Sequence, residues 1–332
     1  MPIMQRSAPP ALDACALHDG HAGNARQALA LAHALTPRPA EHVLAPRAPW
    51  RWWAPRRAPG DNAAFGPGFA ALCRQSPALA IGCGRQAALA TRLLRARGSR
   101  AVQLLDPRLD PRYWDLVVAP AHDGLRGGNV LATLGSLHPV NEDYLLCAIA
   151  AFPALTALPS PHTVLLVGGP TRHAPLDDAA FESLLERLAA QVRAEGGSFS
   201  AIASRRTPPN WRAAIAHVDA ALPGLRWRDT GDGANPYAGL LAYADRIVCT
   251  PDSVNMLSEA AATRAPLFAW APERLQGRPR QFLDVLLSSG RARPLDEALA
   301  AFPVTPLRET ARVAEAVRER LGLANAPMPA KA

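Results

Sequence analysis

Residues 246–269 read RIVCTPDSVNMLSEAAATRAPLFA and contain one strand–helix–strand repeat. The apolar run Arg246–Thr250 predicts a buried strand, Val254–Thr263 predicts a helix, and Pro266–Ala269 predicts the next strand. Short strands joined by helices are typical of parallel sheets, because the helix returns the chain to the edge where the next parallel strand starts. This segment therefore predicts an α/β protein.

The same alternation extends over most of the chain. In the first half, the predicted strands are Ala14–Leu17, Val43–Leu44, Leu79–Cys83, Val102–Leu105 and Leu116–Ala119, and the predicted helices are Asn24–Leu35, Arg85–Arg97 and Glu142–Ala151. In the second half, strands are predicted at Thr163–Val167, Ser198–Ala203 and Leu225–Arg228, and helices at Asp177–Ala194, Pro209–His217, Pro236–Ala244 and Glu309–Leu321. We interpret the two halves as two doubly wound, Rossmann-like domains facing a cleft.

The length of 332 residues fits two domains of about 150 residues each. The proline-rich stretch 152–161 is the predicted linker, so we place the domains at 1–155 and 156–322, with a flexible tail at 323–332. Residues 144–171 carry no formal charge, but prolines and a glycine pair interrupt them. We therefore do not expect a transmembrane helix there.

Composition narrows the class of protein. With 49% hydrophobic and 19% charged residues the chain is globular. Of the net charge of +8, residues 1–160 carry +6, yet no aromatic–basic motif indicates a nucleic-acid partner. The five cysteines include no CxxC pair, which favours a reducing compartment and argues against a metal site. No apolar signal segment is visible at the N-terminus, so we expect a cytoplasmic protein.

Residues that directly follow a strand are the candidates for ligand binding. After the first strand, Gly20, Gly23 and Asn24 lie where a helix begins and could present backbone N–H groups to an anion, while Asp19 is a catalytic candidate. The alternative is a tight turn with Asn24 as the helix N-cap. Metal binding by the two histidines of this loop is the least favoured reading.

A second catalytic candidate follows the strand Leu116–Ala119. His122 next to Asp123 could act as a general base that removes a proton from an acceptor hydroxyl. The alternative is a capped turn.

Two loops of the second half suit a phosphate. Gly168 and Gly169 end a buried strand, and glycines there allow main-chain N–H groups to approach an anion. The next strand ends at Ser204-Arg205-Arg206-Thr207, where two guanidinium groups suit a diphosphate. The alternative for the second loop is a solvated turn.

The richest stretch runs from Asn235 to Glu259. Ser253 starts a helix whose free N–H groups could bind a phosphate, and the carboxylate of Glu259 could accept hydrogen bonds from both ribose hydroxyls. The further binding candidates in this stretch are Asn235, Tyr237, Thr250, Asp252, Asn255 and Met256. The alternative is that Ser253 is only an N-cap and Glu259 only a surface charge.

Several of these motifs together resemble the mitochondrial-fission "elongated mitochondria" family over about Cys15 to Gly290. The motifs are Asp19-Gly20-x-x-Gly23-Asn24-x-x-Gln27, His122-Asp123, Ser204-Arg205-Arg206-Thr207, Asn235-Pro236-Tyr237, Ala244-Asp245, Thr250-Pro251-Asp252-Ser253-Val254-Asn255-Met256 and Glu259-Ala260. The family in turn resembles the GT-B glycosyltransferases. The resemblance implies that Ser253 and Asn255 contact phosphate and Glu259 the ribose, and it supplies no catalytic residue.

Trp50, Trp52 and Trp53 stand among arginines in the segment 49–57, PWRWWAPRR. Indoles and arginines together suit the interface of an anionic membrane, here the inner face of the cytoplasmic membrane. The alternative is a surface loop whose tryptophans pack on the N-terminal domain.

The leading hypothesis is a GT-B-like transferase that moves a sugar from a nucleotide-diphosphate donor to a cell-envelope acceptor, without a metal or a further cofactor. The alternative is a non-catalytic adaptor that recruits a protein partner. A nicotinamide-dependent epimerase is disfavoured, because no GxGxxG follows the first strand.

Overall fold

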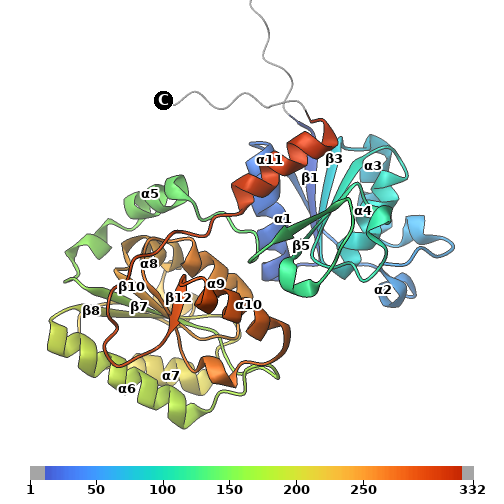
Figure 1. Ribbon diagram of the computed structural model, residues 1–332. Coiled ribbons are helices and arrows are strands. Elements are labelled where there is room, and N and C mark those ends of the chain that lie inside the picture. The colour runs from blue at the N-terminus through green and yellow to red at the C-terminus, as the bar shows by residue number, and fades with distance from the viewer. Residues whose placement is uncertain (1–11, 324–332) are drawn as a thin grey trace, which may run out of the picture. The chain divides into compact units, whose positions relative to one another are not determined.

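The computed structural model describes residues 12–323, which form two compact units. Unit 1 contains the chain up to Pro139 together with the segment from Glu309 onward, and unit 2 is Val140–Arg308. Figure 1 shows that each unit has a central sheet covered by helices.

Unit 1 is built on six parallel strands in the order β2-β1-β3-β4-β5-β6. The strands are β1 (Ala14–His18), β2 (Ala40–Val43), β3 (Leu79–Cys83), β4 (Arg100–Leu104), β5 (Leu116–Pro120) and β6 (Val130–Thr133). The helices are α1 (Ala22–Leu35), α2 (Trp50–Trp53), α3 (Gly66–Gln75), α4 (Arg85–Arg95) and α11 (Thr310–Leu321). Alternate strand residues face opposite sides, so Ala14 and Ala16 pack with α1 and α11, whereas Cys15 and Leu17 pack with α3 and α4.

Unit 2 repeats this plan with the strand order β12-β11-β10-β7-β8-β9, again all parallel. The strands are β7 (His162–Val167), β8 (Ser198–Ala203), β9 (Arg226–Trp227), β10 (Arg246–Cys249), β11 (Leu267–Ala269) and β12 (Ala292–Pro294). The helices are α5 (Glu142–Ala151), α6 (Asp178–Glu195), α7 (Pro209–His217), α8 (Tyr237–Tyr243), α9 (Val254–Ala261) and α10 (Gly277–Ser288).

Each sheet has one point where the strand order reverses. In unit 1 the chain passes from β1 to β2 on one side and then to β3 on the other. In unit 2 it passes from β7 to β8 and β9 and then crosses to β10 on the opposite side of β7. Doubly wound sheets bind ligands outside the carboxyl ends of such strand pairs, so β1–β3 and β7–β10 locate the candidate sites.

The structure confirms the predicted α/β class and most of the predicted elements, and it places the division of the chain elsewhere. The break lies at 139/140 rather than 155/156, and α11 belongs to unit 1. The proline-rich stretch is not a linker, because Leu155 is buried in the core of unit 2 and the Thr156 hydroxyl is 2.8 Å from Tyr243 Oη. The predicted tail begins at 323, and 324–332 lie outside the described residues.

Several elements were not predicted, namely α2, α3, α10, β6 and β12, and the strand expected at Val43–Leu44 lies at Ala40–Val43. Five of the ten residues in α3 are glycine, proline or polar, so the sequence shows no clear helical pattern there. Among residues 12–323, no helix is long and apolar enough to span a bilayer. The uncharged stretch 144–171 is divided among α5, a 3₁₀ turn and β7; the helix end and the strand were predicted, whereas the linker between them was not confirmed.

Candidate functional site

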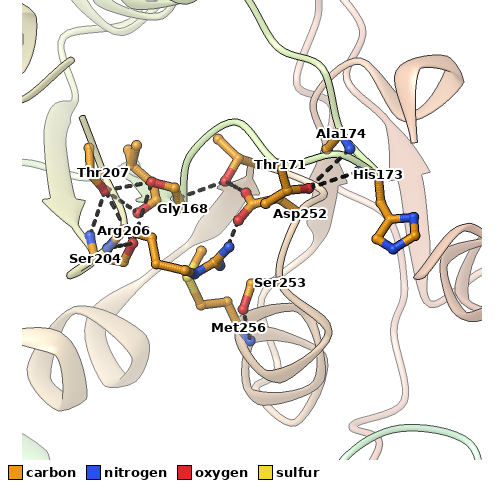
Figure 2. Close-up of polar contacts among 12 residues, drawn as sticks. Gly168, Thr171, His173, Ala174, Ser204, Arg206, Thr207, Asp252, Ser253 and Met256 are labelled. Atoms are coloured by element: carbon orange, nitrogen blue, oxygen red, sulfur yellow. Dashed lines mark hydrogen bonds and ion pairs between the residues drawn. The ribbon is translucent and has the colours of Figure 1, made fainter. Parts of the chain in front are cut away.

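The switch point of unit 2 brings together three loops, which follow β7, β8 and β10 (Figure 2). The backbone N–H of Gly168 donates to Thr250 Oγ1 at 2.8 Å, and this hydroxyl donates to Asp252 Oδ1 at 2.7 Å. Arg206 donates from Nη2 to Asp252 Oδ2 at 2.6 Å. The three loops are therefore linked by one chain of hydrogen bonds.

Asp252 is the centre of this chain. Its carboxylate is fully buried, and burial raises its pKa even though Arg206, Thr250 and the N–H of Gly169 act in the opposite direction. A Cβ at Gly168 would lie 2.1 Å from Asp252 Oδ2, so only glycine fits beside the carboxylate. Asp252 holds the half-exposed guanidinium of Arg206 at the ligand edge of the sheet.

In the loop after β8, the hydroxyl of Thr207 joins this loop to the loop after β7. Thr207 Oγ1 donates to the carbonyl of Gly168 at 2.6 Å and accepts from the N–H of Ser204 at 2.9 Å. Gly169 is needed there, because a Cβ would lie 2.6 Å from the carbonyl oxygen of Arg206. Thr207 was predicted as a ligand contact, but its side chain is buried and its hydroxyl is already hydrogen-bonded to other residues of the protein.

The two predicted arginines differ in their surroundings. Arg206 binds Asp252, whereas the side chain of Arg205 is exposed and has no hydrogen bond or ion pair within residues 12–323. Arg212, which the sequence analysis did not single out, ties this loop down by donating to the carbonyls of Thr207 and Ser204, both at 3.0 Å. Because Arg212 lies within a predicted helix, nothing in the sequence indicated that it would contact the preceding loop.

Ser253 is the N-cap of α9. Its Oγ accepts a hydrogen bond from the N–H of Met256 at 3.4 Å, so the N-cap interpretation is right for the side chain. The first N–H groups of a helix have no partner within the helix, and Asn255 and Met256 are half-buried in this turn. The turn follows directly on Asp252, which anchors Arg206.

Glu259 is not a surface charge. Only 3% of it is exposed, and Tyr237 Oη donates to its Oε2 at 2.6 Å. Tyr237 starts α8, where Asn235 Oδ1 accepts from its N–H at 2.9 Å. The fold thus places the predicted ribose residue on the second turn of α9 and fixes it with a tyrosine from the preceding helix.

The switch point of unit 1 contains the loop after β1. Asn24 Nδ2 donates to both carboxylate oxygens of Asp19, at 3.0 and 3.2 Å, and His21 Nδ1 is 3.0 Å from Oδ1. Desolvation raises the pKa of Asp19, but the hydrogen bonds from Asn24 and His21 outweigh it and lower the pKa below its usual value. The N-cap of α1 is His21, so the alternative in which Asn24 is the N-cap is wrong.

Gly84 completes this cluster and was missed. It follows β3, has φ +90°, and a Cβ there would lie 2.6 Å from Asn24 Nδ2. A glycine directly after a predicted strand was the available signal. Gly20, with φ +80°, allows the chain to turn after Asp19, and Gly23 lies in the first turn of α1.

His122 and Asp123 form a 3₁₀ turn after β5 and are both half-buried. In the sheet, β5 lies three strands from β1, a separation of about 14 Å. His122 and Asp19 therefore do not form one catalytic group within unit 1.

Other candidate features lie away from these loops. Within residues 12–323, no three His, Cys, Asp or Glu side chains are grouped as a metal ion would require. A cavity of about 740 Å³ lies between α6 and α7 and includes none of the predicted site residues. Trp52 and Trp53 are 62% and 52% exposed, so these two side chains do not pack on the N-terminal domain as the alternative interpretation required. Trp50 packs partly on the core of unit 1.

Two six-stranded parallel sheets, each with its own switch point, define a GT-B-like protein of Rossmann-like units. A UDP-GlcNAc 2-epimerase from Methanocaldococcus jannaschii has a similar fold, with a TM-score of 0.58 and 11% sequence identity, covering 92% of this chain and 99% of that one. The model of the family "Mitochondrial fission ELM1" matches residues 22–321, and the chain belongs to this family.

Two further proteins are similar to this chain in sequence. The "Mitochondrial fission protein ELM1" of Arabidopsis thaliana is 27% identical over 290 residues, which cover 76% of this chain and 67% of the relative. The "Uncharacterized protein RP120" of Rickettsia prowazekii is 25% identical over 284 residues, covering 73% and 79% respectively. The family and the fold class inferred from the sequence are confirmed.

Proposed function

We propose that unit 2 binds a nucleotide-diphosphate sugar at the β7–β10 switch point. The observation that carries this proposal is the chain from Thr250 through Asp252 to Arg206, which holds a half-exposed guanidinium beside the first turn of α9. A diphosphate there would receive the guanidinium and the free N–H groups that follow Ser253. The similarly folded epimerase is named for a UDP-sugar, which supports the ligand class.

In this proposal the ribose lies against Glu259. A carboxylate can accept from both ribose hydroxyls, and the bond from Tyr237 keeps Glu259 in one rotamer. Asn255 and Met256 belong to the turn between the phosphate and the ribose positions.

The reaction we propose is transfer of the sugar to a hydroxyl of a cell-envelope acceptor. The acceptor oxygen bonds to the anomeric carbon, the nucleoside diphosphate leaves, and a base takes the hydroxyl proton. Arg206 and the helix N–H groups stabilise the leaving diphosphate, with no metal or further cofactor. Asp19, His122 and Asp123 are the candidate bases.

Calorimetric titration with UDP, GDP and CMP tests the binding step. We expect one of them to bind, and Arg206→Ala to weaken binding by roughly tenfold to a hundredfold, as for the loss of a charge-assisted hydrogen bond. Arg187→Ala is the matched control, because it removes the same charge from an exposed side chain of α6 that belongs to none of these loops. The absence of binding by any nucleotide to folded protein would rule the proposal out.

The role of Glu259 has its own test. Glu259→Gln should lower the affinity for the nucleoside diphosphate about tenfold and leave the affinity for pyrophosphate unchanged, since only the first ligand has a ribose. An equal loss for both ligands would contradict the ribose assignment. A thermal melt checks that the buried substitution leaves the protein folded.

The second candidate function is that of an adaptor, favoured by the family's name and by the two exposed tryptophans of α2. For the adaptor, we propose that Trp52 and Trp53 make peripheral contact with an anionic membrane. An adaptor predicts that Glu259→Ala preserves cellular function while Trp52→Ala with Trp53→Ala abolishes it. A transferase predicts the reverse. Incubating the bound nucleotide sugar without acceptor, followed by NMR, reveals whether the protein is instead an epimerase.

A further inference from the structure

A cavity of about 520 Å³ opens in unit 1 at the end of α4. Its charged lining residues are Arg57, Arg92, Arg95, Arg100 and Asp115. Because β4 begins at Arg100 and β5 directly follows Asp115, the cavity lies at the N-terminal edge of the sheet. The loops that follow β1 and β3 are at the opposite edge, so this cavity is separate from the switch point of unit 1.

One carboxylate holds two of the guanidinium groups. Arg95 Nη2 is 3.2 Å and Arg100 Nη1 is 3.9 Å from the same oxygen, Asp115 Oδ1. The other oxygen of Asp115 accepts from the N–H of Ala101 at 2.8 Å. Asp115 therefore positions two arginines at the cavity without neutralising both.

Arg92 has no carboxylate within 4.0 Å in the described part of the chain. Its Nη1 donates to the carbonyl of Pro55 at 2.7 Å, and its guanidinium carbon lies 4.1 Å from the centre of the Tyr113 ring. Burial, and to a lesser extent the charge of Arg57, lower its pKa, while Tyr113 and the more distant carboxylate of Asp61 act in the opposite direction. A partly buried cation with no carboxylate in direct contact is a position that an anion would stabilise.

The end of α4 does not by itself account for these arginines. Basic side chains in a last helical turn often donate to the free carbonyls there. Here Arg92 donates to Pro55, and Arg95 donates to the carbonyl of Arg112 at 3.0 Å, so neither contacts a carbonyl of α4.

Ser99 adds a polar atom without a partner. The residue lines the cavity, is 3% exposed, and its buried Oγ makes no hydrogen bond to any described residue. A buried hydroxyl left unpaired costs free energy, which a ligand oxygen would recover.

The surrounding sequence is strongly basic. Between Glu41 and Asp106 there are ten arginines and one acid, Asp61, which is paired with Arg57. The chain as a whole has a net charge of +8, so this segment accounts for all of the excess. Arg85, the first residue of α4, donates to the carbonyls of Arg51 and Trp52. These bonds place α2, with its exposed tryptophans, beside the N-terminal end of α4, whereas the cavity lies at the C-terminal end.

We propose that this cavity is a binding site for a phosphate monoester. With Asp61 and Asp115 ionised, the four guanidinium groups leave an excess of two positive charges, which a phosphomonoester dianion balances. Arg92, Arg100 and the hydroxyl of Ser99 are the donors to its oxygens. The phosphate can belong to a lipid headgroup or to a small soluble molecule.

The test uses inorganic phosphate in a calorimetric titration, and vesicles of phosphatidylcholine with or without phosphatidic acid in a sedimentation assay. Both are run on the full chain in an Arg206→Ala background, which removes the phosphate site of the proposed function. We expect Arg100→Ala to weaken binding about tenfold and Ser99→Ala about fivefold. Arg74→Ala is the control, because it removes an exposed arginine of the same segment outside the cavity.

Binding of free phosphate that depends on Arg100 and Ser99 supports a soluble ligand. Binding only to the vesicles with phosphatidic acid, with the same dependence, supports a lipid. Folded protein that binds neither probe overturns the proposal. So does an equal loss in Arg74→Ala and Arg100→Ala, or vesicle binding that requires Trp52 and Trp53 but neither Arg100 nor Ser99.

Discussion

At the residue scale, the loops of unit 2 are held together by the contacts of a few side chains. Asp252 is buried and accepts from Thr250, Arg206 and Gly169, and these bonds hold the guanidinium of Arg206 at the carboxyl edge of the sheet. Gly168 is adjacent because a side chain would occupy the space of the carboxylate. The candidate site is therefore built mainly from contacts that position its one half-exposed cation.

Gly168→Ala should destabilise the protein by about 1–3 kcal/mol, the range for overpacking a fixed site. The carboxylate of Asp252 has three partners and cannot move aside for the new methyl group. Urea denaturation measures the change, with Gly128→Ala as control, because a Cβ at Gly128 meets nothing within 4 Å. Equal stability of the two variants would show that the loop adapts.

The raised pKa of Asp252 predicts a pH dependence. The folded state holds the proton more tightly than the unfolded state, so this contribution to stability is full below the unfolded value of 3.8 and is lost as pH rises through the folded value. Asp252→Asn removes the titration, so the stability of this variant relative to wild type should increase as pH rises through the same window. Denaturant curves from pH 4 to 7 measure the stability of both proteins. A difference between variant and wild type that stays constant over this range would refute the prediction.

At the element scale, α5 and the turn after it belong to unit 2. Tyr243 of α8 joins them, because its Oη is 2.8 Å from the hydroxyl of Thr156 and donates to the carbonyl of Ile149 at 3.3 Å. Leu145 and Leu155 pack into the same core. A stretch that reads as a proline-rich linker is thus a packed part of the domain.

Tyr243→Phe should lower the free energy of unfolding of unit 2 by about 1 kcal/mol, the typical contribution of one hydrogen bond. Hydrogen exchange should show faster opening of α5 and unchanged protection of β1 and β3, which are in unit 1. Equal effects on both units, or none on α5, would argue against this assignment of the segment.

At the scale of the whole molecule, two similar units share one chain that passes between them twice, at 139/140 and at 308/309. The return places α11 against α1, where Val313, Val317 and Leu321 are buried (Figure 1). The cores also enclose four of the five cysteines, and burial raises the pKa of Cys15 to about 12 and that of Cys249 well above its usual range.

Native protein should therefore react with a thiol reagent at one cysteine, Cys147, which is exposed on α5. The other four should react only after denaturation, because buried thiols neither ionise nor meet the reagent. Mass spectrometry after brief alkylation at pH 8 identifies the site. Rapid labelling of Cys83 or Cys249 would show that a core opens readily.

The order of short apolar strands and helices determined the α/β class and the candidate loops, because strand period and post-strand glycines are local properties. The motif from Thr250 to Glu259 likewise indicated the family. The tertiary structure decided which residues meet. It separated Asp19 from His122 by three strands, distinguished Arg206 from Arg205, buried Glu259 against Tyr237 and gathered arginines around Ser99. These pairings depend on strand order and on side-chain packing between distant segments, which no local pattern in the sequence records.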